Sequence, residues 1–561
     1  MAGSRHAPCW PAFSERFFAG FTTNPVHQRC PAEGLASPPP IKATISRPRC
    51  LSHLANELRK QILGIVTAAE TGSAIFTFDN TYARELEGYY VPWTPATVPE
   101  PQLVKVNAGL ARELGLDAGA LAAAEGINIL AGNSVPVGAT PIAQAYAGHQ
   151  FGQFSPQLGD GRALLLGEII DRHGQRRDIA FKGSGPTPFS RRGDGKCTLG
   201  AALREYLIGE AMAALGIPTT RSLAVVSTGE TIRRDRPLPG AVLTRVAASH
   251  LRVGTFEFFA AHQGPEAVRK LADYAIRRHY PELAEADRPY LELLKAVADR
   301  QAELVARWLG VGFIHGVMNT DNMTISGETI DYGPCAFIEA YHPRTVFSSI
   351  DASGRYAYGQ QAAIARWNLA RLAESLLPLI DADTERAVAA ATEVLDAFPE
   401  QHGACWLSVM RAKLGLSADT VDAAGDRALT DDFLTLLQHG RIDFTQAFRA
   451  LYDLARGNTE ASSRLFPPAE FAAWRQRWQT RQPERSETAL AAMRGANPCY
   501  IPRNHRVEAA LDAAVDGGDL QPFERLLAVV EQPFDERAAD AEFAEPAPPE
   551  VTACYQTFCG T

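Results

Sequence analysis

The hydrophobic pattern of the chain changes near residue 250, and this change limits the folds that the chain can adopt. From Ala143 to Thr244, short apolar runs are separated by glycines and interrupted by one long helical pattern. From Arg252 onward the sequence is rich in alanine and leucine, with mostly helical spacing. We therefore predict an α+β protein in which a small strand-rich lobe precedes a larger helical one. A length of 561 residues allows about three to four domain equivalents.

Composition and charge exclude several classes of protein. Hydrophobic residues make up 46% and charged residues 21% of the chain, as in ordinary globular proteins. A net charge of −9 gives no reason to expect nucleic acid or an anionic membrane as a partner, and no apolar run predicts a membrane span. The nine cysteines form no CxxC pair for zinc and lack the density of a disulfide scaffold. A reducing compartment is the simpler interpretation, and the cytoplasm is the expected location.

The first 60 residues differ from the rest of the chain. They contain eight Lys or Arg against three Asp or Glu, and a run of prolines at 38–40. This balance is typical of a transit peptide, but the prolines would break the amphipathic helix that such a peptide forms. A disordered arm or an upstream start codon explains the segment equally well, so we expect residues 1–75 to be a disordered or targeting extension. A transit peptide in a eukaryote would make the location mitochondrial.

A glycine turn before a hairpin is the first candidate for phosphate binding. Gly159 to Arg162 (GDGR) precede the predicted strand RALLLGEII, whose hairpin partner DIAFKG carries Lys182. Backbone amides without side chains can approach phosphates closely, and the lysine adds a positive charge. The turn matches neither GxxxxGK[ST] nor GxGxxG, so a plain hairpin turn is equally consistent with this feature alone.

A predicted helix from Cys197 to Leu215 follows the lysine strand, as in protein kinases, where a glutamate of the next helix pairs with the lysine. This helix carries Glu205 and Glu210. At about 100° per residue, Glu210 lies in the apolar stripe and Glu205 lies to its side, so spacing alone favours Glu210. A solvated glutamate on an alanine-rich helix is the more ordinary outcome for either residue.

The segment HGVMNTDNMTISGETIDYG contains the most specific pattern in the chain. Kinases place an HxD motif five residues before an asparagine; His315 and Asn322 keep this spacing, but Val317 occupies the aspartate position. The usual catalytic base is therefore absent. The neighbouring Asp321 could replace it if its side chain turns toward the acceptor.

The same segment also predicts a metal site. A tight hairpin from Met323 to Ile330 would bring Asn322 close to Asp331. One amide oxygen and one carboxylate are suitable ligands for Mg²⁺ on a triphosphate. The alternative is that Asp321 and Asn322 merely cap the hairpin.

Arginines near residue 250 could bind phosphate oxygens. Arg245 in LTRVA and Arg252 in SHLRVG follow a strand predicted from Ala241. The planar guanidinium group matches phosphate geometry and stays charged, although each arginine alone could be a solvated surface residue. The polar loop after the lysine strand, which is long enough to cover a nucleotide, contains Arg191, Arg192, Asp194 and Gly195.

Together these segments resemble the selenoprotein O family of kinase-like proteins, also called YdiU. The matching motifs are AQAYAGHQFGQFSPQLGDGRALLLGE, FKGSGPTPFSRRGDGK, LREYLIGEAMAALGIPTTR, SHLRVGTFE, GFIHGVMNTDNM, IDYGP and NPCYIPRNHRVEAAL. These motifs are long and keep their order. The resemblance runs from about Phe78 to the C-terminus.

The resemblance implies a bilobal, protein-kinase-like pseudokinase fold. An N-terminal segment and strand-rich N-lobe would span 76–250, a helical C-lobe with the metal site 251–450, and a helical C-terminal extension 451–561. ATP would bind in an inverted orientation, so that AMP is transferred to Ser, Thr or Tyr hydroxyls of proteins and pyrophosphate leaves. The implied metal is Mg²⁺, and some members transfer UMP with Mn²⁺. ATP and proteins would be the partners, with neither nucleic acid nor a membrane.

The resemblance also implies roles for individual residues. Asp321 would be the catalytic base, Asn322 and Asp331 the metal ligands, and Glu205 the carboxylate that pairs with Lys182, against the preference from spacing. The residues that contact ATP would be Gly159, Gly161, Arg162, Lys182, Asp194, Gly195, Arg245, Arg252 and Asp331.

Many relatives carry a cysteine or selenocysteine third from the C-terminus, and Cys559 occupies that position here. The resemblance makes a redox role plausible. The segment AYHPRTVFSSID, downstream of DYGP, lacks the cysteine with which the terminal one is thought to pair in relatives. Cys335 and Cys554 are the nearest alternatives, and a free thiol is the favoured interpretation.

Two other functions compete with AMP transfer. An ordinary ATP-dependent phosphotransferase fits the bilobal plan but conflicts with Val317. A non-catalytic nucleotide-binding redox module gives Cys559 a task. It leaves unexplained why Asp321, Asn322 and Asp331 retain a complete set of base and metal ligands.

Overall fold

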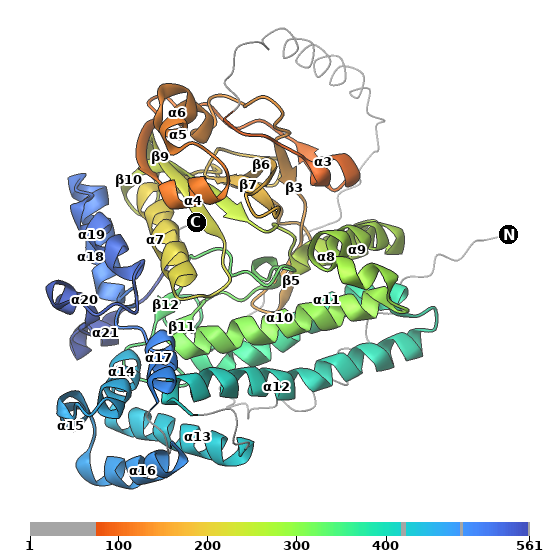
Figure 1. The fold of residues 1–561 in the computed structure, drawn as a ribbon. Helices are drawn as coiled ribbons and strands as arrows, with labels where there is room; N and C mark the ends of the chain where they lie inside the picture. Colours follow the sequence, from red (N-terminus) through yellow and green to blue (C-terminus); the bar gives the residue numbers. More distant parts are fainter. Residues whose placement is uncertain (1–74, 417–421, 483–485, 559–561) are drawn as a thin grey trace, which may run out of the picture. The chain divides into compact units, whose positions relative to one another are not determined.

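The structure is a computed structural model that describes residues 75–416, 422–482 and 486–558. The expected extension at 1–75, except for its last residue, and Cys559 lie outside the described residues. Within the described ranges the predicted α+β class is confirmed, because an antiparallel sheet dominates the first part and helices the remainder (Figure 1).

One antiparallel sheet forms the strand-rich part of the chain. Its strands follow the order β1-β3-β6-β7-β10-β9-β2, and β8 pairs with β10. The strands of this sheet are β1 (Tyr90–Pro92), β2 (Gln102–Val106), β3 (Ile142–Gln144), β6 (Ala163–Ile170), β7 (Arg176–Lys182), β8 (Cys197–Thr198), β9 (Arg221–Arg233) and β10 (Pro237–Ala247). Two separate strand pairs are β4 (Gly148–Gln150) with β5 (Gln153–Ser155), and β11 (Phe313–Ile314) with β12 (Ala336–Phe337).

The predicted hairpin that carries Lys182 is confirmed. β6 and β7 pair in antiparallel register, with Ala163 opposite Lys182 and Ile170 opposite Arg176. The strand predicted from Ala241 is also confirmed as part of β10, which pairs with β7 on one side and with β9 on the other. Lys182 therefore lies at the end of a central strand rather than at an edge of the sheet.

Helices cover both faces of the sheet. On one face lie α4 (Ala108–Glu113), α5 (Ala118–Ala122) and α6 (Ala124–Leu130), where Leu110 and Leu130 join a core with Phe181 and Val242. Successive side chains of a strand point to opposite faces, so Lys182 points away from this core. α7 (Leu199–Ala214) lies on the opposite face against β9 and β10. The sheet therefore has a hydrophobic face and a face that carries the lysine.

The apolar residues from Leu103 to Leu116 have the spacing of a helix, but they do not form one helix. Residues 102–106 form β2, which pairs with β9 at the edge of the sheet. Asn107 then caps α4, because its side chain accepts a hydrogen bond from the amide of Leu110. The apolar residues belong to two consecutive elements, β2 and α4, that pack on one core. Their combined spacing is similar to that of a single helix.

The helix predicted from Cys197 to Leu215 is confirmed as α7, with its first two residues in β8 instead. The hydroxyl of Thr198 accepts from the amide of Ala201 and begins the helix. α18 (Asn504–Gly517) and α19 (Gln521–Val530) lie against α7, as the blue and yellow ribbons of Figure 1 show. α7 is therefore buried between the sheet and two C-terminal helices.

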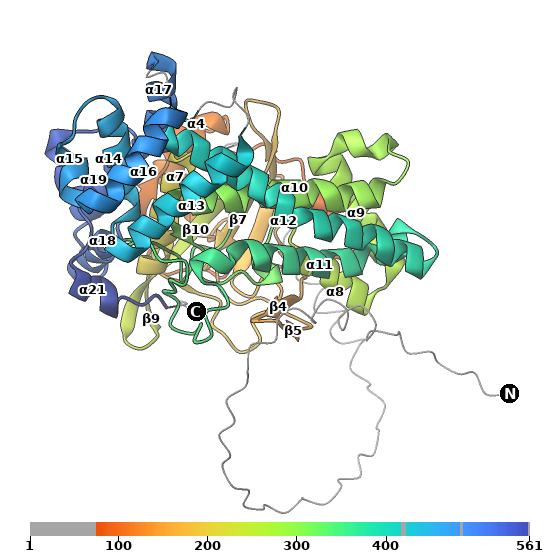
Figure 2. The same ribbon diagram turned by 90° about the horizontal axis from the view of Figure 1, so that it is seen from below.

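Helices follow the sheet from residue 253, as the sequence predicts. They are α8 (Val253–His262), α9 (Pro265–His279), α10 (Pro289–Val311), α11 (Gln361–Ile380) and α12 (Thr384–Leu414). α10, α11 and α12 pack against one another along their lengths (Figure 1, Figure 2). In the part of the chain that the structure describes, no helix has the length and apolar character needed to span a membrane.

Further helices make up the C-terminal part of the chain. They are α13 (Ala423–Gly440), α14 (Phe444–Ala455), α15 (Glu460–Leu465), α16 (Pro468–Arg481), α17 (Glu487–Ala496), α18, α19, α20 (Ala541–Ala544) and α21 (Pro549–Cys554), with the short α3 (Thr81–Glu85) at the other end of the chain. One hydrophobic cluster includes Leu414, Phe433, Phe448, Trp474 and Met493. The expected boundary at residue 450 lies within α14, inside this cluster.

The motif NPCYIPRNHR ties the C-terminal helices to the segment that follows Asp331. Arg503 is completely buried and donates to Glu339 (2.8 Å) and to Asp443 (2.7 and 3.0 Å). The side chain of Asn504 pairs with the backbone of Phe337 in β12 through two hydrogen bonds. The last third of the chain therefore supports the region in which the sequence places the metal site.

Candidate active site

The turn from Gly159 to Arg162 leads directly into β6. Gly159 has a φ of 68°, and a Cβ on it would lie 2.3 Å from the ring of Phe189, so only glycine fits. The loop that contains Phe189 is anchored to the turn, because Thr187 donates to the carbonyl of Asp160 (2.6 Å). The turn is thus held against the polar loop that follows the lysine strand.

Lys182 and Arg245 share one face of the sheet and meet Glu205 of α7. Lys182 lies opposite Leu243 in the register of β7 and β10, and Arg245 is two residues further along β10, on the same face. Lys182 Nζ contacts Glu205 Oε2, and Arg245 Nε donates to Glu205 Oε1 at 2.7 Å. All three side chains are buried. Glu205, rather than Glu210, therefore lies beside the lysine.

The carboxylate of Asp331 closes this cluster from the opposite side. It accepts from Arg245 Nη2 at 2.5 Å, from Lys182 Nζ at 3.2 Å and from Arg252 Nη1 at 3.2 Å. Burial by itself raises the pKa of a carboxyl group, but these cations outweigh burial and hold the pKa of Asp331 well below its usual range. The positive field of Arg162 acts in the same direction. The site thus concentrates cations around two carboxylates.

Asp331 has an unusual backbone conformation. Its φ of 62° lies in the left-handed region, which few residues other than glycine adopt. The turn continues with a hydrogen bond from the amide of Gly333 to the carbonyl of Asp331 (2.8 Å). The surrounding contacts therefore fix the direction of this carboxylate at some cost in backbone strain.

Asp321 lies in a short 3₁₀ turn, Thr320–Asn322, beside the hairpin of β4 and β5. Its Oδ1 is buried and has no hydrogen-bond partner among the described residues, and a Cβ at Gly148 would lie 2.4 Å from it. Burial raises the pKa of Asp321 to about 7, although Arg252 opposes the shift. Arg252 also holds the backbone, since its Nη1 donates to the carbonyl of Asp321 at 2.8 Å. One carboxylate oxygen is therefore available to a further partner.

Asn322 follows in the same turn, and its amide nitrogen donates to the carbonyl of Val317 at 3.0 Å. This bond orients the amide group and leaves its oxygen for another ligand. The strands predicted from Met323 to Ile330 do not form. Instead, Thr324 makes an isolated bridge to Arg252, and Thr329 makes one to Thr219. The segment is therefore held by neighbouring parts of the chain and not by pairing between its own two halves. The turn still brings residues 322 and 331 into one region.

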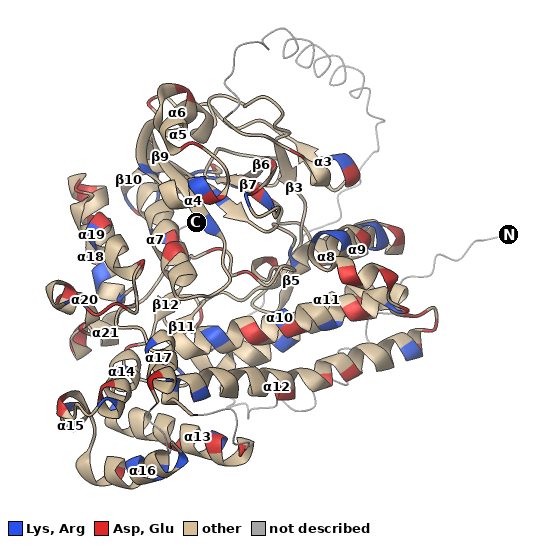
Figure 3. Cartoon of the chain, viewed as in Figure 1, with Lys and Arg blue, Asp and Glu red and all other residues tan. Residues whose placement is uncertain are grey.

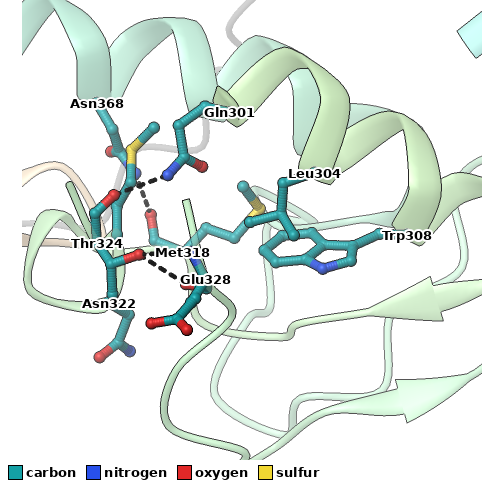
Figure 4. Close-up of a pocket in the computed structure, with 9 residues that line it drawn as sticks. Gln301, Leu304, Trp308, Met318, Asn322, Thr324, Glu328 and Asn368 are labelled. Carbon is teal, nitrogen blue, oxygen red and sulfur yellow. Dashed lines mark hydrogen bonds between the residues drawn. The ribbon is translucent and has the colours of Figure 1, made fainter. Parts of the chain in front are cut away.

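A small pocket lies behind this loop, between α10 and α11 (Figure 4). Gln301 of α10 donates to the carbonyl of Thr324 (2.8 Å), and Asn368 of α11 donates to the carbonyl of Met318 (3.0 Å). The other residues that line the pocket are Leu304, Trp308, Met318, Asn322, Met323, Thr324 and Glu328. The sequence reasoning missed Gln301 and Asn368, and the signal that could have found them is a single amide within an apolar helix face.

Some predicted residues lie apart from the cluster. Asp194 is half exposed and pairs with Arg234 (2.7 Å), which lowers its pKa through that hydrogen bond. Gly195 packs tightly against the backbone of Gly185. Glu210 forms a two-bond ion pair with Arg221 (2.8 and 2.6 Å), so the preference for Glu210 from spacing is wrong. The structure therefore brings together the lysine, the arginines and the carboxylates of the predicted site, but it does not bring Asp194 and Gly195 to them.

Glu205 and Glu210 offer a matched test of this geometry. Both are buried on α7, and both bind cations. We expect Glu205→Gln to weaken ATP binding about tenfold or more, because Lys182 and Arg245 lose the carboxylate that orients them, and this loss outweighs the gain from removing one negative charge. Glu210→Gln should leave ATP affinity within about twofold, since its partner is Arg221. Calorimetric titration of both variants with ATP tests the role of Glu205, and equal losses of ATP affinity in the two variants would contradict it.

The donor set fits a magnesium ion that shares its ligands with a nucleotide. Among the described residues, no group of three His, Cys, Asp or Glu side chains could hold a metal alone. Asn322 and Asp331 could supply two hard oxygen ligands, and Mg²⁺ usually takes one or two protein ligands together with phosphate oxygens and water. Asp321 adds an unpartnered oxygen beside them. The residues present are therefore compatible with Mg²⁺ or Mn²⁺.

Charged residues of both signs are mixed along the described part of the chain. Figure 3 shows Lys and Arg interspersed with Asp and Glu along the helices. The net charge of the chain is −9. Because the overall charge is negative, binding of an anion depends on cations held in position, such as those around Glu205 and Asp331.

The α+β fold and the buried cluster of cations and carboxylates fit a transferase that handles phosphate groups. The family model described as Protein adenylyltransferase SelO matches residues 74–531 of the chain. The chain belongs to this family, which confirms the resemblance seen in its motifs.

Curated bacterial relatives are similar over nearly their whole length. The protein nucleotidyltransferase YdiU of Cereibacter sphaeroides is 59% identical over 488 residues, which cover 87% of this chain and 100% of that protein. The protein of the same name from Rhodopseudomonas palustris is 56% identical over 492 residues, which cover 87% and 99% of the two chains. That of Methylorubrum populi is 55% identical over 501 residues, which cover 87% and 100%.

Proposed function

We propose that this protein transfers AMP from ATP to Ser, Thr or Tyr hydroxyls of other proteins. One observation carries the proposal: the buried cations Lys182, Arg245 and Arg252 converge on the partly buried Asp331, while the kinase base position holds Val317. Membership of a family described as protein adenylyltransferases supports it.

The cation cluster suits pyrophosphate as the leaving group. With the β- and γ-phosphates at Lys182, Arg245 and Arg252, the charge that develops on pyrophosphate is stabilised where it forms. The α-phosphate would then face the acceptor. The acceptor oxygen forms a bond to the α-phosphorus, and the bond from this phosphorus to the bridging oxygen of the β-phosphate breaks.

Asp321 is the group that would take the proton from the acceptor hydroxyl. Its Oδ1 is buried without a partner among the described residues, so no existing hydrogen bond must break. Arg252 fixes the backbone of Asp321 and also contacts Asp331, so the proton acceptor and the phosphate site are held by one side chain.

Asn322 and Asp331 would hold the divalent metal. Bound Mg²⁺ or Mn²⁺ would neutralise charge on the phosphates of the nucleotide. Transfer of UMP with Mn²⁺ is part of the proposal and is tested by replacing ATP with UTP.

The remaining assignments follow from the family resemblance. We place the nucleotide between the sheet and the helices, as two lobes of a kinase-like fold, and the lysine and glutamate pair on β7 and α7 supports this arrangement. Gly159, Gly161, Arg162, Asp194 and Gly195 are proposed as further nucleotide contacts. We propose the cytoplasm as the location, in keeping with the scattered cysteines and the bacterial relatives.

The position of the radioactive phosphorus in ATP tests the proposal. The purified protein with Mg²⁺ and α-³²P-ATP should label itself or proteins of a cell extract, whereas γ-³²P-ATP should give no label. Label from γ-³²P-ATP alone would establish the phosphotransferase instead. Binding of ATP with no label from either compound would favour the non-catalytic module.

A further inference from the structure

Three successive carbonyl groups directly after Asp331 and Tyr332 are each bound by a side chain from elsewhere in the chain. The carbonyl of Gly333 accepts from Arg204 Nε (3.3 Å), that of Pro334 from Thr557 Oγ1 (2.8 Å) and that of Cys335 from Arg204 Nη2 (2.9 Å). Most hydrogen bonds in proteins join two backbone groups, so three successive carbonyls bound by side chains are unusual. Because all three carbonyls bind side chains from other parts of the chain, these side chains determine the position of the loop.

Arg204 connects this loop to α7 and to the C-terminal helices. It precedes Glu205, so the same turn of α7 contacts the cation cluster and the loop after Asp331. Its Nη1 donates to Glu508 of α18 at 2.7 Å. The hydroxyl of Tyr555 donates to the same carboxylate oxygen at 2.7 Å. The guanidinium group is therefore held in place by partners that lie 300 residues or more away in sequence.

The segment after α21 reaches the same loop. Thr557 donates its amide hydrogen to the carbonyl of Phe347 (2.8 Å), and its own carbonyl accepts from Ser349 (2.9 Å). The rings of Tyr555 and Phe347 pack edge to face, with centroids 5.6 Å apart. This segment thus forms one isolated parallel bridge, between Thr557 and Ser348, while the Thr557 hydroxyl reaches the loop and the Tyr555 hydroxyl contacts Arg204.

We propose that Arg204, Tyr555 and Thr557 are positioning residues that fix the Asp331 loop for metal-dependent nucleotide binding. The inference rests on the proposed function, because it concerns the same site. Asp331 is held in a strained conformation, and the three carbonyl contacts beyond it keep the loop from relaxing. Arg204, Tyr555 and Thr557 therefore act on the proposed site through hydrogen bonds to the loop and to one another.

Thr557→Val, with Thr552→Val as the matched control, tests the inference. Both residues lie in the last segment, but Thr552 bonds only within α21, to the carbonyl of Pro548. The affinity for α,β-methylene-ATP, in which the bond that should break is blocked, is measured by calorimetry with Mg²⁺ and again with EDTA. We expect Thr557→Val to lower the affinity in Mg²⁺ about fivefold, the effect of one hydrogen bond, and to leave the affinity in EDTA unchanged. Thr552→Val should match the wild type in both.

Two more variants allow the inference to be tested even if Thr557→Val is unstable. Tyr555→Phe removes one hydroxyl group and should give a similar loss in Mg²⁺, whereas Arg204→Gln should give a larger one. Unchanged affinity in Mg²⁺ for all three variants would overturn the inference, as would equal losses in Mg²⁺ and EDTA, which a merely structural role would produce. The proposed function is tested separately by the α- and γ-label, because affinity for a blocked nucleotide does not depend on which group is transferred.

Discussion

Replacing Asp331 by asparagine is expected to lower AMP transfer about a thousandfold. The variant removes one of two proposed metal ligands and leaves Lys182 and Arg245 with the carboxylate of Glu205. Asparagine still accepts hydrogen bonds, so the cations keep a partner and the fold is retained. Metal-free ATP should bind at least as tightly as to the wild type, because the site loses a negative charge.

The measurement compares initial rates of α-³²P incorporation with calorimetric ATP affinity in Mg²⁺ and in EDTA. Asp516→Asn is the control, since this exposed carboxylate pairs with Arg236 on the surface, and it should change neither quantity. A rate for Asp331→Asn within tenfold of the wild type would contradict the proposed role. So would a Mg²⁺-dependent gain in affinity that persists in the variant.

Replacing Arg503 by methionine should destabilise the fold by about 3–5 kcal/mol. Arg503 is completely buried, and its removal leaves Glu339 and Asp443 buried without their cation. The pKa of Glu339 is already raised to about 7 by burial, in spite of Arg503, so the loss of this partner favours the neutral form further. Unpaired buried carboxylates are costly, which is the source of the large effect.

Urea unfolding followed by tryptophan fluorescence measures this loss, because Trp474 and Trp478 lie in the hydrophobic cluster of the C-terminal helices. Arg506→Met is the control, in the first turn of α18, the helix whose N-cap is Arg503. Arg506 is partly exposed and pairs with Glu542 at 3.4 Å, so its loss should cost less than about 1 kcal/mol. The double variant Arg503→Met with Asp443→Asn should recover part of the stability. Equal effects of the two arginine variants would contradict the argument.

Local patterns predicted the elements of the site well. The hairpin of Lys182 and the helix of Glu205 follow from alternating and helical apolar spacing with clear turn signals, and both are confirmed. The spacing of His315 and Asn322 depends only on the order of residues along the chain, so it could be recognised without any tertiary information.

The choice between Glu205 and Glu210 could not be made from helical periodicity. α7 is covered by the sheet on one side and by α18 and α19 on the other, so its apolar stripe does not identify the side that faces Lys182. Gln301 and Asn368 were missed for a related reason. Their amide groups act on a loop that is brought to them only by the packing of α10 and α11.

The left-handed backbone at Asp331 determines which inactive variant is useful for isolating acceptor proteins. Asparagine adopts this conformation readily, whereas alanine would cost roughly 1–2 kcal/mol there and would favour a rearranged loop. Asp331→Asn therefore keeps the recognition surface that an acceptor meets, while its chemistry is stopped. It is the form to immobilise as bait, and an alanine variant would capture fewer acceptors because its loop no longer has the native shape.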